Sequence, residues 1–345
     1  MGLLSLRPLA VALAVTIAAA IGALLVAGCG ARGDSRGASR GKNATLVLDF
    51  TPNAVHAGIY SALARGYDRD QGVRLHVVAP SASTDSIKLL RTGRANFAIL
   101  DIHDLAIARQ RGEDIVGLMS IVERPLAALI AAPAIRSPRD LAGKVVGVTG
   151  VPSDNAVLHS IVAGAGGDPR AVKTVTIGFN AVASLLAARI AAATSFWNDE
   201  GVTLTRRRPG FHVFHVESFG GPDYPELVLC ATGASLHADP SLARRVVRAL
   251  VRGYGVTLSD PRASAADLER LVPGLDPSLM SAELRALSGS SRAPDGKVGK
   301  LDLRQLQAWA PWEAREGIVS RQPDVSAMFD PGFVAGAGPA LSGPR

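Results

Sequence analysis

The sequence contains very little cysteine. Only Cys29 and Cys230 occur among its 345 residues, and two thiols cannot build the disulfide framework that stabilises small secreted domains. Cys230 lies in the apolar stretch ELVLCAT, where a buried and unreactive thiol is expected. The chain must therefore fold around a packed core, and its 48% of hydrophobic residues is enough to form one.

Aromatic residues are also scarce, at 5% of the chain, and the basic residues are scattered. The formal net charge is +7, yet the longest basic run is Arg206-Arg207-Arg208, which is typical of a solvated turn. Nucleic-acid binding needs a basic surface, often interleaved with aromatic side chains, so we expect no nucleic-acid partner. An exported protein beside an anionic membrane surface explains the positive charge equally well.

Several motifs of common enzymes and scaffolds are missing. No glycine-rich dinucleotide fingerprint follows the first predicted strand, and GVTGVPSDN lacks a nucleophile elbow. No short repeat indicates a solenoid. Five histidines show no metal-ligand spacing and are expected to be exposed or hydrogen-bonded: His103, His159, His212, His215 and His237. In a strand, His212 and His215 point to opposite faces. The sequence therefore predicts no cofactor and no metal.

A single long apolar run is present, from Leu9 to Val26. It is long enough to be an uncleaved membrane helix. However, Val26-Ala27-Gly28-Cys29 at its end resembles a bacterial lipobox, in which small residues precede the cysteine that carries the lipid. We therefore predict a lipoprotein signal peptide at residues 1–28, lipidation of Cys29 and a Gly-, Ser- and Arg-rich flexible tether at residues 29–43. More than one acyl chain would anchor the protein stably to the membrane.

From Thr45 onward, apolar strand patterns alternate with helix patterns that end at glycine. The alternation begins again near residue 128, and the chain becomes mainly helical after Ser235. This order predicts an α/β fold with two lobes, a ligand in the cleft and closure about a hinge. We expect lobe 1 at residues 44–127, lobe 2 at 128–227, and a return to lobe 1 with C-terminal helices at 228–345.

The stretch LVLDFTPNAVHAGIY, from Leu46 to Tyr60, turns abruptly from apolar to polar. Asp49, Asn53 and His56 follow the first predicted strand within a few residues. Ligands of open α/β sheets lie just beyond the carboxyl ends of strands. This stretch therefore predicts part of a binding site.

The same residues resemble a motif of a known protein family. LDFTPNAVHAGIYSALARGYDRDQGV is similar to the first motif of substrate-binding proteins for thiamine pyrimidine precursors, which belong to a superfamily with alkanesulfonate binders and thiamine pyrimidine synthases. The segments LLRTGRANFAILD, DLAGKVVGVTGVPSDNAVL, IGFNAVASLLAARI, FWNDEGVTL and ESFGGPDYPELVL resemble later motifs of that family. The resemblance covers about residues 45–319. It implies a two-lobed periplasmic-binding-protein fold of type II, whose C-terminal helices pack on lobe 1.

The family's ligand is a formylated aminomethyl-aminopyrimidine or a close relative, and several residue types suit such a ring. Phe50, Trp197 and Tyr224 could provide aromatic faces. Acceptors for an exocyclic amine could come from four carboxylates: Asp49, Asp101, Glu200 and Glu226. Directional hydrogen bonds could come from Asn53, His56 and Ser153.

Most of these residues also have a purely structural interpretation. Phe50, which replaces the family's usual Trp, and Trp197 could be core residues, and Asp101 could cap the following helix. His56 could bond to backbone, while Tyr224 and Glu226 could shape the turn around Pro225. Asp49 has the weakest alternative, because a carboxylate that ends an apolar strand needs a partner.

The resemblance leaves three functional classes open. The enzymes of the superfamily use a lysine, a sacrificial histidine and a cysteine-rich run, but the matching positions here are Leu100, Asp104 and residues 222–226, PDYPE. We therefore expect no enzyme but a monomeric binding protein that delivers a thiamine precursor, or another flat heterocycle or a sulfonate, to an ABC permease and its ATPase. It would be anchored at the extracytoplasmic face of the cell membrane. A sensor that reports to a membrane kinase is the third class.

Overall fold

The computed structural model describes residues 41–290 and 296–337 of the protein. The predicted signal peptide, most of the tether and Cys29 lie outside these residues. The part from Gly41 onward forms one compact unit. No helix among the residues described is long and apolar enough to cross a membrane.

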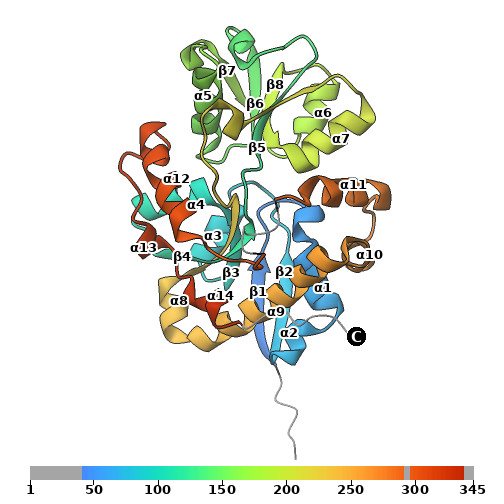
Figure 1. Ribbon diagram of the computed structural model, residues 1–345, viewed down its shortest axis with the longest axis vertical. Coiled ribbons are helices and arrows are strands. Elements are labelled where there is room, and N and C mark those ends of the chain that lie inside the picture. The colour runs from blue at the N-terminus through green and yellow to red at the C-terminus, as the bar shows by residue number, and fades with distance from the viewer. Residues whose placement is uncertain (1–40, 291–295, 338–345) are drawn as a thin grey trace, which may run out of the picture. The chain divides into compact units, whose positions relative to one another are not determined.

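Two five-stranded sheets form the framework (Figure 1). The sheet of lobe 1 has the strands, in spatial order, β2 (Val73–Val78), β1 (Lys42–Val47), β3 (Phe97–Asp101), β10 (Leu227–Thr232) and β4 (Ile115–Val122). The sheet of lobe 2 has the order β7 (Lys173–Thr176), β6 (Val145–Val148), β8 (Ala192–Phe196), β5 (Ala127–Ala131) and β9 (His212–His215).

The two sheets share one topology. In each, three neighbouring strands are parallel, and the strand that arrives from the other lobe, β10 or β5, is antiparallel to both its neighbours. The chain crosses between the lobes at residues 123–126 and returns at residues 220–226. These two crossings lie next to each other because β10 pairs with β4, so they form a natural hinge.

Short helices connect the strands. Lobe 1 contains η1 (Ala54–His56), α1 (Ala57–Ala64), α2 (Tyr67–Asp70), α3 (Asp85–Arg91) and α4 (Ile102–Gln110). Lobe 2 contains η2 (Pro138–Leu141), α5 (Asp154–Gly164), η3 (Pro169–Ala171), α6 (Ala181–Leu186), the π-helical turn η4 (Trp197–Gly201), α7 (Val202–Arg207) and η5 (Val216–Phe219).

The C-terminal part is helical, as the sequence predicts, and packs on lobe 1 (Figure 1). It consists of α8 (Gly233–Ala238), α9 (Pro240–Ser259), α10 (Pro261–Leu271), α11 (Pro277–Leu287), α12 (Leu303–Arg315), α13 (Val325–Met328) and α14 (Gly332–Ala335). Asp239 caps α9 by accepting the N–H of Leu242 at 3.0 Å, and Pro240 occupies the first turn, where its missing N–H costs nothing.

Helix α9 packs unusually closely against α1. A Cβ added to Gly253 would lie 2.0 Å from the carbonyl oxygen of Gly58, and one added to Gly58 would lie 2.4 Å from the ring of Tyr254. Only glycine permits this approach. The Tyr254 hydroxyl then reaches the carbonyl of Val55 at 3.0 Å, which fixes the η1 turn where the site begins.

One predicted helix is interrupted. The pattern HAGIYSALARGYDRDQG suggests one continuous helix, but the structure ends α1 at Ala64 and starts α2 at Tyr67. Gly66 adopts a left-handed φ of 72° between them, which breaks the helical path. The chain can then turn into β2.

Candidate functional site

A cavity of about 500 Å³ lies between the two lobes, at the carboxyl ends of their central strands. Its lining contains acidic side chains, aromatic side chains, hydroxyls and exposed cations: Asp49, Phe50, Asn53, Ser83, Thr84, Ser86, Lys88, Arg91, Asp101, Asp104, Arg111, Thr149, Ser153, Asp154, Phe179, Thr194, Ser195, Phe196, Asp199 and Glu200, together with apolar residues of both lobes. This volume suits a small organic ligand.

The turn after β1 arranges three of the predicted residues into one network. Asn53 begins η1, and its backbone N–H donates to Nδ1 of His56 at 3.2 Å. Because Nδ1 accepts, the ring proton sits on Nε2 and is donated to Oδ1 of Asp49 at 2.9 Å. His56 is fully buried and does not line the cavity, whereas Asp49 and Asn53 do. The histidine therefore holds the Asp49 carboxylate at the cavity wall.

Contacts between the lobes close around the cavity. The side-chain amide of Asn53 donates to Oδ2 of Asp199 at 2.7 Å. The Ser83 hydroxyl donates to the carbonyl of Thr149 at 3.1 Å. Phe50 of lobe 1 meets Phe179 of lobe 2 edge to face, with ring centroids 4.4 Å apart.

Two further carboxyl groups of the lining, one from each lobe, are held by hydrogen bonds. The N–H of Ser153 donates to Oδ1 of Asp104 at 3.3 Å. Asp154 accepts from the hydroxyls of Thr149 and Thr194, each at 2.8 Å. Both carboxyl groups are thus held by uncharged donors.

The buried carboxyl groups set the electrostatics of the site. Burial raises the pKa of Asp104 to about 8, with a further contribution from the Asp101 carboxylate, and burial together with Asp199 raises the pKa of Glu200 to about 8. Burial also raises the pKa values of Asp154 and Asp199. Three cations in the lining, Lys88, Arg91 and Arg111, are exposed. The cavity is therefore acidic inside and basic only at its exposed edge.

Six of the predicted site residues line this cavity: Asp49, Phe50, Asn53, Asp101, Ser153 and Glu200. Glu200 accepts the N–H of Phe196 at 3.0 Å, which turns its carboxyl group inward beside β8. Asp101 caps α4 by accepting the N–H of His103 at 2.7 Å, as its structural interpretation predicts, and also faces the cavity.

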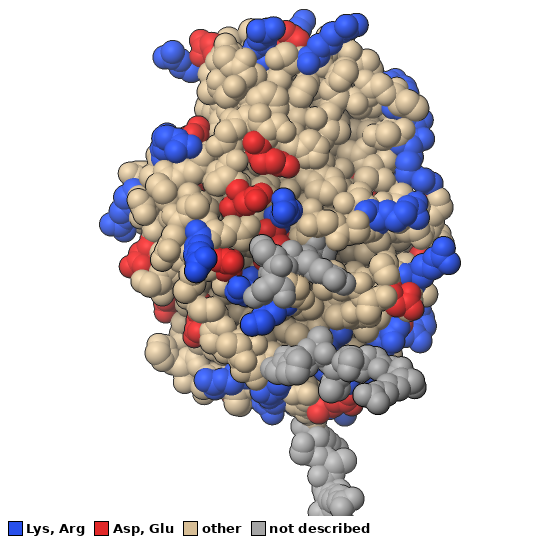
Figure 2. All heavy atoms as spheres, viewed as in Figure 1, with Lys and Arg blue, Asp and Glu red and all other residues tan. Residues whose placement is uncertain are grey.

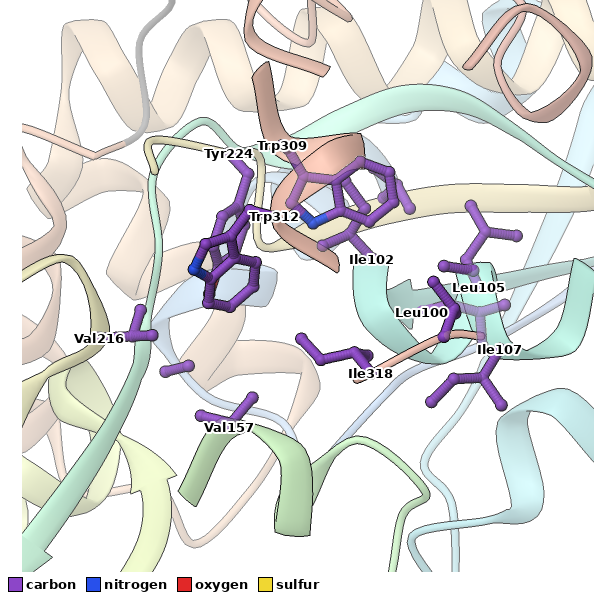
Figure 3. Packing of buried hydrophobic residues seen from close by; sticks show 14 of the residues in the cluster. Leu100, Ile102, Leu105, Ile107, Val157, Val216, Tyr224, Trp309, Trp312 and Ile318 are labelled. Carbon is purple, nitrogen blue, oxygen red and sulfur yellow. The ribbon is translucent and has the colours of Figure 1, made fainter. Parts of the chain in front are cut away.

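The other four predicted residues lie outside the lining. His56 acts behind Asp49, as described above. Trp197 donates from its indole N–H to the carbonyl of Pro125 at 3.0 Å and packs against His215. Tyr224 is fully buried, and its ring contacts those of His103 and Trp312; Figure 3 shows it beside Trp312. Glu226, also fully buried, accepts the backbone N–H groups of Leu126 and Ala127.

These four side chains do not line the cavity in this structure, and the reason is topological. Tyr224 and Glu226 belong to the returning crossing, and Trp197 contacts the outgoing crossing at Pro125, so these side chains bind the hinge rather than face the cavity.

Several lining residues were not among the predicted site residues. Asp104, Asp154 and Asp199 lie just after the carboxyl ends of β3, β6 and β8, so the rule that selected Asp49 also points to them. Phe179 belongs to the motif IGFNAVASLLAARI, but only the closed lobes bring it to Phe50. No motif of the sequence points to the exposed Lys88.

The fold and the enclosed cavity define a two-lobed α/β protein of the periplasmic-binding-protein type. Solved structures of this type resemble most of the chain. The periplasmic nitrate-binding protein of Synechocystis aligns with a TM-score of 0.71 and 11% identity over 88% of this chain and 90% of its own. The periplasmic aliphatic sulphonate binding protein of Escherichia coli aligns with a TM-score of 0.64 and 13% identity over 83% and 96%. At such identities the likeness concerns the fold alone.

The chain belongs to the family described as NMT1/THI5 like, whose model matches residues 53–264. Among its relatives, the formylaminopyrimidine-binding protein of Halalkalibacterium halodurans is 29% identical over 77% of this chain and 83% of its own length. The riboflavin-binding protein of Chloroflexus aurantiacus is 25% identical over 86% and 87%. The 4-amino-5-hydroxymethyl-2-methylpyrimidine phosphate synthase of Legionella pneumophila is 24% identical over 63% and 70%.

Proposed function

We propose that this protein is the solute-binding component of an ABC importer and that it closes its lobes around a thiamine pyrimidine precursor, such as N-formyl-4-amino-5-aminomethyl-2-methylpyrimidine. Its similarity to a formylaminopyrimidine-binding protein supports the ligand class. The likeness of its fold to periplasmic binding proteins supports the capture of a solute by two lobes.

The acidic interior of the cavity is the observation that carries this proposal. Asp49, Asp104, Asp199 and Glu200 offer acceptors, whereas the cations of the lining are exposed. A 4-aminopyrimidine presents an exocyclic amine and a ring nitrogen that can be protonated, and both gain from carboxylate partners. A sulfonate or nitrate would instead be buried without a buried cation to pair with, because the cations of the lining are exposed, and burying an unpaired charge is costly.

The aromatic pair suits a flat ring as well. Phe50 and Phe179 are both partly buried, line the cavity and contact each other across it. A ring enclosed beside them would bury apolar surface against both lobes at once. In this proposal the ligand adds to the interlobe contacts and so favours the closed form.

The proposal includes the location and partners of the protein. We infer an extracytoplasmic, monomeric protein, anchored through lipid at Cys29 and presenting its closed form to a permease and its ATPase. Loss of membrane association in Cys29→Ser, measured by cell fractionation, tests the anchor. If that variant stays with the membrane fraction, the lipid anchor is not the attachment.

Thermal unfolding of the chain from Gly30 onward tests the ligand. The compounds are formylaminopyrimidine, the plain hydroxymethylpyrimidine, thiamine, riboflavin, pyridoxal phosphate and taurine. A ligand at about 100 times its Kd stabilises the folded protein by about 2.7 kcal/mol, which raises Tm by several degrees. We expect this shift with the pyrimidines. A shift with riboflavin or taurine alone would refute the assignment of a pyrimidine ligand. Imine formation with pyridoxal phosphate would favour an enzymatic function over a binding function.

A further inference from the structure

A buried polar cluster lies behind the cavity, where the first turn of α4 meets α12 and the returning crossing. It contains Asp101, His103, Glu226 and Glu313, and three aromatic side chains surround it: Tyr224, Trp309 and Trp312. Figure 3 shows Tyr224 beside Trp312, with Trp309 close by. His103, Glu226 and Glu313 are fully buried, and Asp101 is half-buried at the cavity wall.

His103 is oriented by a carboxylate. Its Nδ1 lies within hydrogen-bond distance of Oε1 of Glu313. A carboxylate can only accept, so Nδ1 carries the proton and donates it. The other ring nitrogen, Nε2, is buried and has no hydrogen-bond partner among the residues described. A histidine whose one nitrogen donates to a carboxylate while the other stays available is the usual arrangement of a metal ligand.

Glu226 is oriented in a similar way. Its Oε2 accepts from the N–H groups of Leu126 and Ala127, while Oε1 is buried and accepts from no N–H or hydroxyl group of the described residues; the carboxyl group of Asp101 lies beside that of Glu226. One potential ligand atom from each of Asp101, His103 and Glu226 lies within 4.8 Å of the other two. Bonds of about 2.0–2.2 Å to a zinc ion place ligand atoms about 3–4 Å apart, so small side-chain rotations suffice.

The charge of the cluster needs compensation. Asp101, Glu226 and Glu313 surround one imidazole, and no lysine or arginine among the described residues makes an ion pair with them. A neutral His103 leaves this negative charge uncompensated, whereas a protonated ring would bury an Nε2–H without an acceptor, which is costly.

We propose that Asp101, His103 and Glu226 bind one divalent transition-metal ion, of which Zn²⁺ is the best match. Nε2 of His103, Oε1 of Glu226 and the Asp101 carboxylate supply a mixed nitrogen and oxygen donor set that suits this ion. Glu313 orients the histidine. Protons of the cluster leave as the ion enters. The ion joins Glu226 of the returning crossing to lobe 1 beside the ligand cavity.

Zinc binding by the full chain, stripped with a chelator, tests this site. The metal retained after gel filtration is measured by elemental analysis, and the Kd by calorimetry. We expect one Zn²⁺ per chain, with no comparable retention of Mg²⁺. Affinity should fall from pH 8 to pH 6 because protons compete for the ligands.

Two conservative variants keep the local structure intact. In Asp101→Asn the amide oxygen still caps α4, and in Glu226→Gln it still accepts the two backbone N–H groups. Each should weaken zinc binding at least tenfold, while circular dichroism and Tm without metal stay near wild type. The matched control, His215→Ala, removes a more exposed histidine paired with Glu217 at 3.6 Å and should leave zinc binding unchanged.

Three results would overturn the site. They are no zinc retained by the wild-type chain, equal retention by both conservative variants, or loss of zinc in His215→Ala instead. The inference does not depend on the proposed pyrimidine ligand. The Tm shifts with pyrimidines are measured on chelator-treated protein. Failure of the pyrimidine proposal can therefore be distinguished from failure of the zinc site.

Discussion

The side-chain amide of Asn53 joins the two lobes by donating a 2.7 Å hydrogen bond to Asp199, and its oxygen at the same time caps η1 by accepting the N–H of Val55 at 2.9 Å. One side chain thus fixes the turn after β1 and a contact that exists only when the lobes are closed. This double role makes Asn53 a direct test of closure.

Asn53→Ser should separate the two roles. Serine still caps the helix but is too short to reach Asp199. We expect the Kd for formylaminopyrimidine to rise about five- to tenfold, equivalent to about 1 kcal/mol, with little change in the Tm of the unliganded protein. The exposed Asn43→Ser is the control. In a double-mutant cycle with Asp199→Ala, purely additive effects would show that the pair does not act together.

Replacing either phenylalanine of the interlobe pair should weaken ligand binding. Phe50→Ala or Phe179→Ala removes an aromatic wall of the cavity and the 4.4 Å edge-to-face contact. We expect roughly tenfold weaker binding for each, and a double variant less impaired than the sum, because such pairs contribute about 0.5–1.5 kcal/mol beyond burial. Calorimetry measures the effect. Phe211→Ala, in lobe 2 but outside the lining, should bind as wild type.

The unliganded protein should be more stable at pH 5 than at pH 8. Burial raises the pKa values of Asp104 and Glu200 to about 8 from 3.8 and 4.5. At pH values between the unfolded-state and the folded-state pKa, the folded chain keeps protons that the unfolded chain releases. The free energy of unfolding therefore falls as pH rises.

Urea denaturation between pH 5 and pH 8 measures this slope. Each such carboxyl group contributes up to about 1.4 kcal/mol per pH unit. Glu200→Gln should flatten the slope, since the amide cannot ionise. Asp239, whose pKa is lowered, loses its contribution only in more acidic solution. Stability that rises from pH 5 to pH 8 would contradict the buried, protonated state of these groups.

Glu226→Ala should destabilise the hinge. The carboxylate accepts the N–H groups of Leu126 and Ala127 and so links the returning crossing to the outgoing one. Without it, two buried donors lose their partner, which costs about 1–3 kcal/mol each. Urea denaturation should show this loss, whereas Glu226→Gln should recover most of it. Glu217→Ala, at a more exposed position, serves as the control; an equal effect there would remove the hinge explanation.

Gly253→Ala should destabilise the packing of α9 on α1. The added methyl group would lie 2.0 Å from the carbonyl oxygen of Gly58, so the helices must separate. We expect a loss of about 1–3 kcal/mol, as for other overpacked cores. At Gly289 an added Cβ meets nothing within 4 Å, so Gly289→Ala is the matched control. Equal stability of the two variants would show that the helix contact is not tight.

The order of elements is readable from the sequence because it rests on local signals. Asp239, Pro240 and the apolar positions of α9 mark that helix, and alternating strand and helix patterns mark two similar sheets. The positions of Asp49 and Asn53 at the cavity follow from the rule on strand ends. The motifs that contain Tyr224 and Trp197 do not indicate which way these side chains point, because an aromatic residue in a motif can face either a ligand or a hinge.

The fold class, the family and the acidic character of the strand ends can all be read from the sequence, because periodicity, capping residues and motifs are properties of neighbouring positions. Which side chains share a wall of the cavity follows from the three-dimensional packing. The contacts Phe50–Phe179, Asn53–Asp199 and His103–Glu313 join distant segments. They depend on lobe closure and on where the C-terminal helices pack, and both are set by long-range packing rather than local pattern.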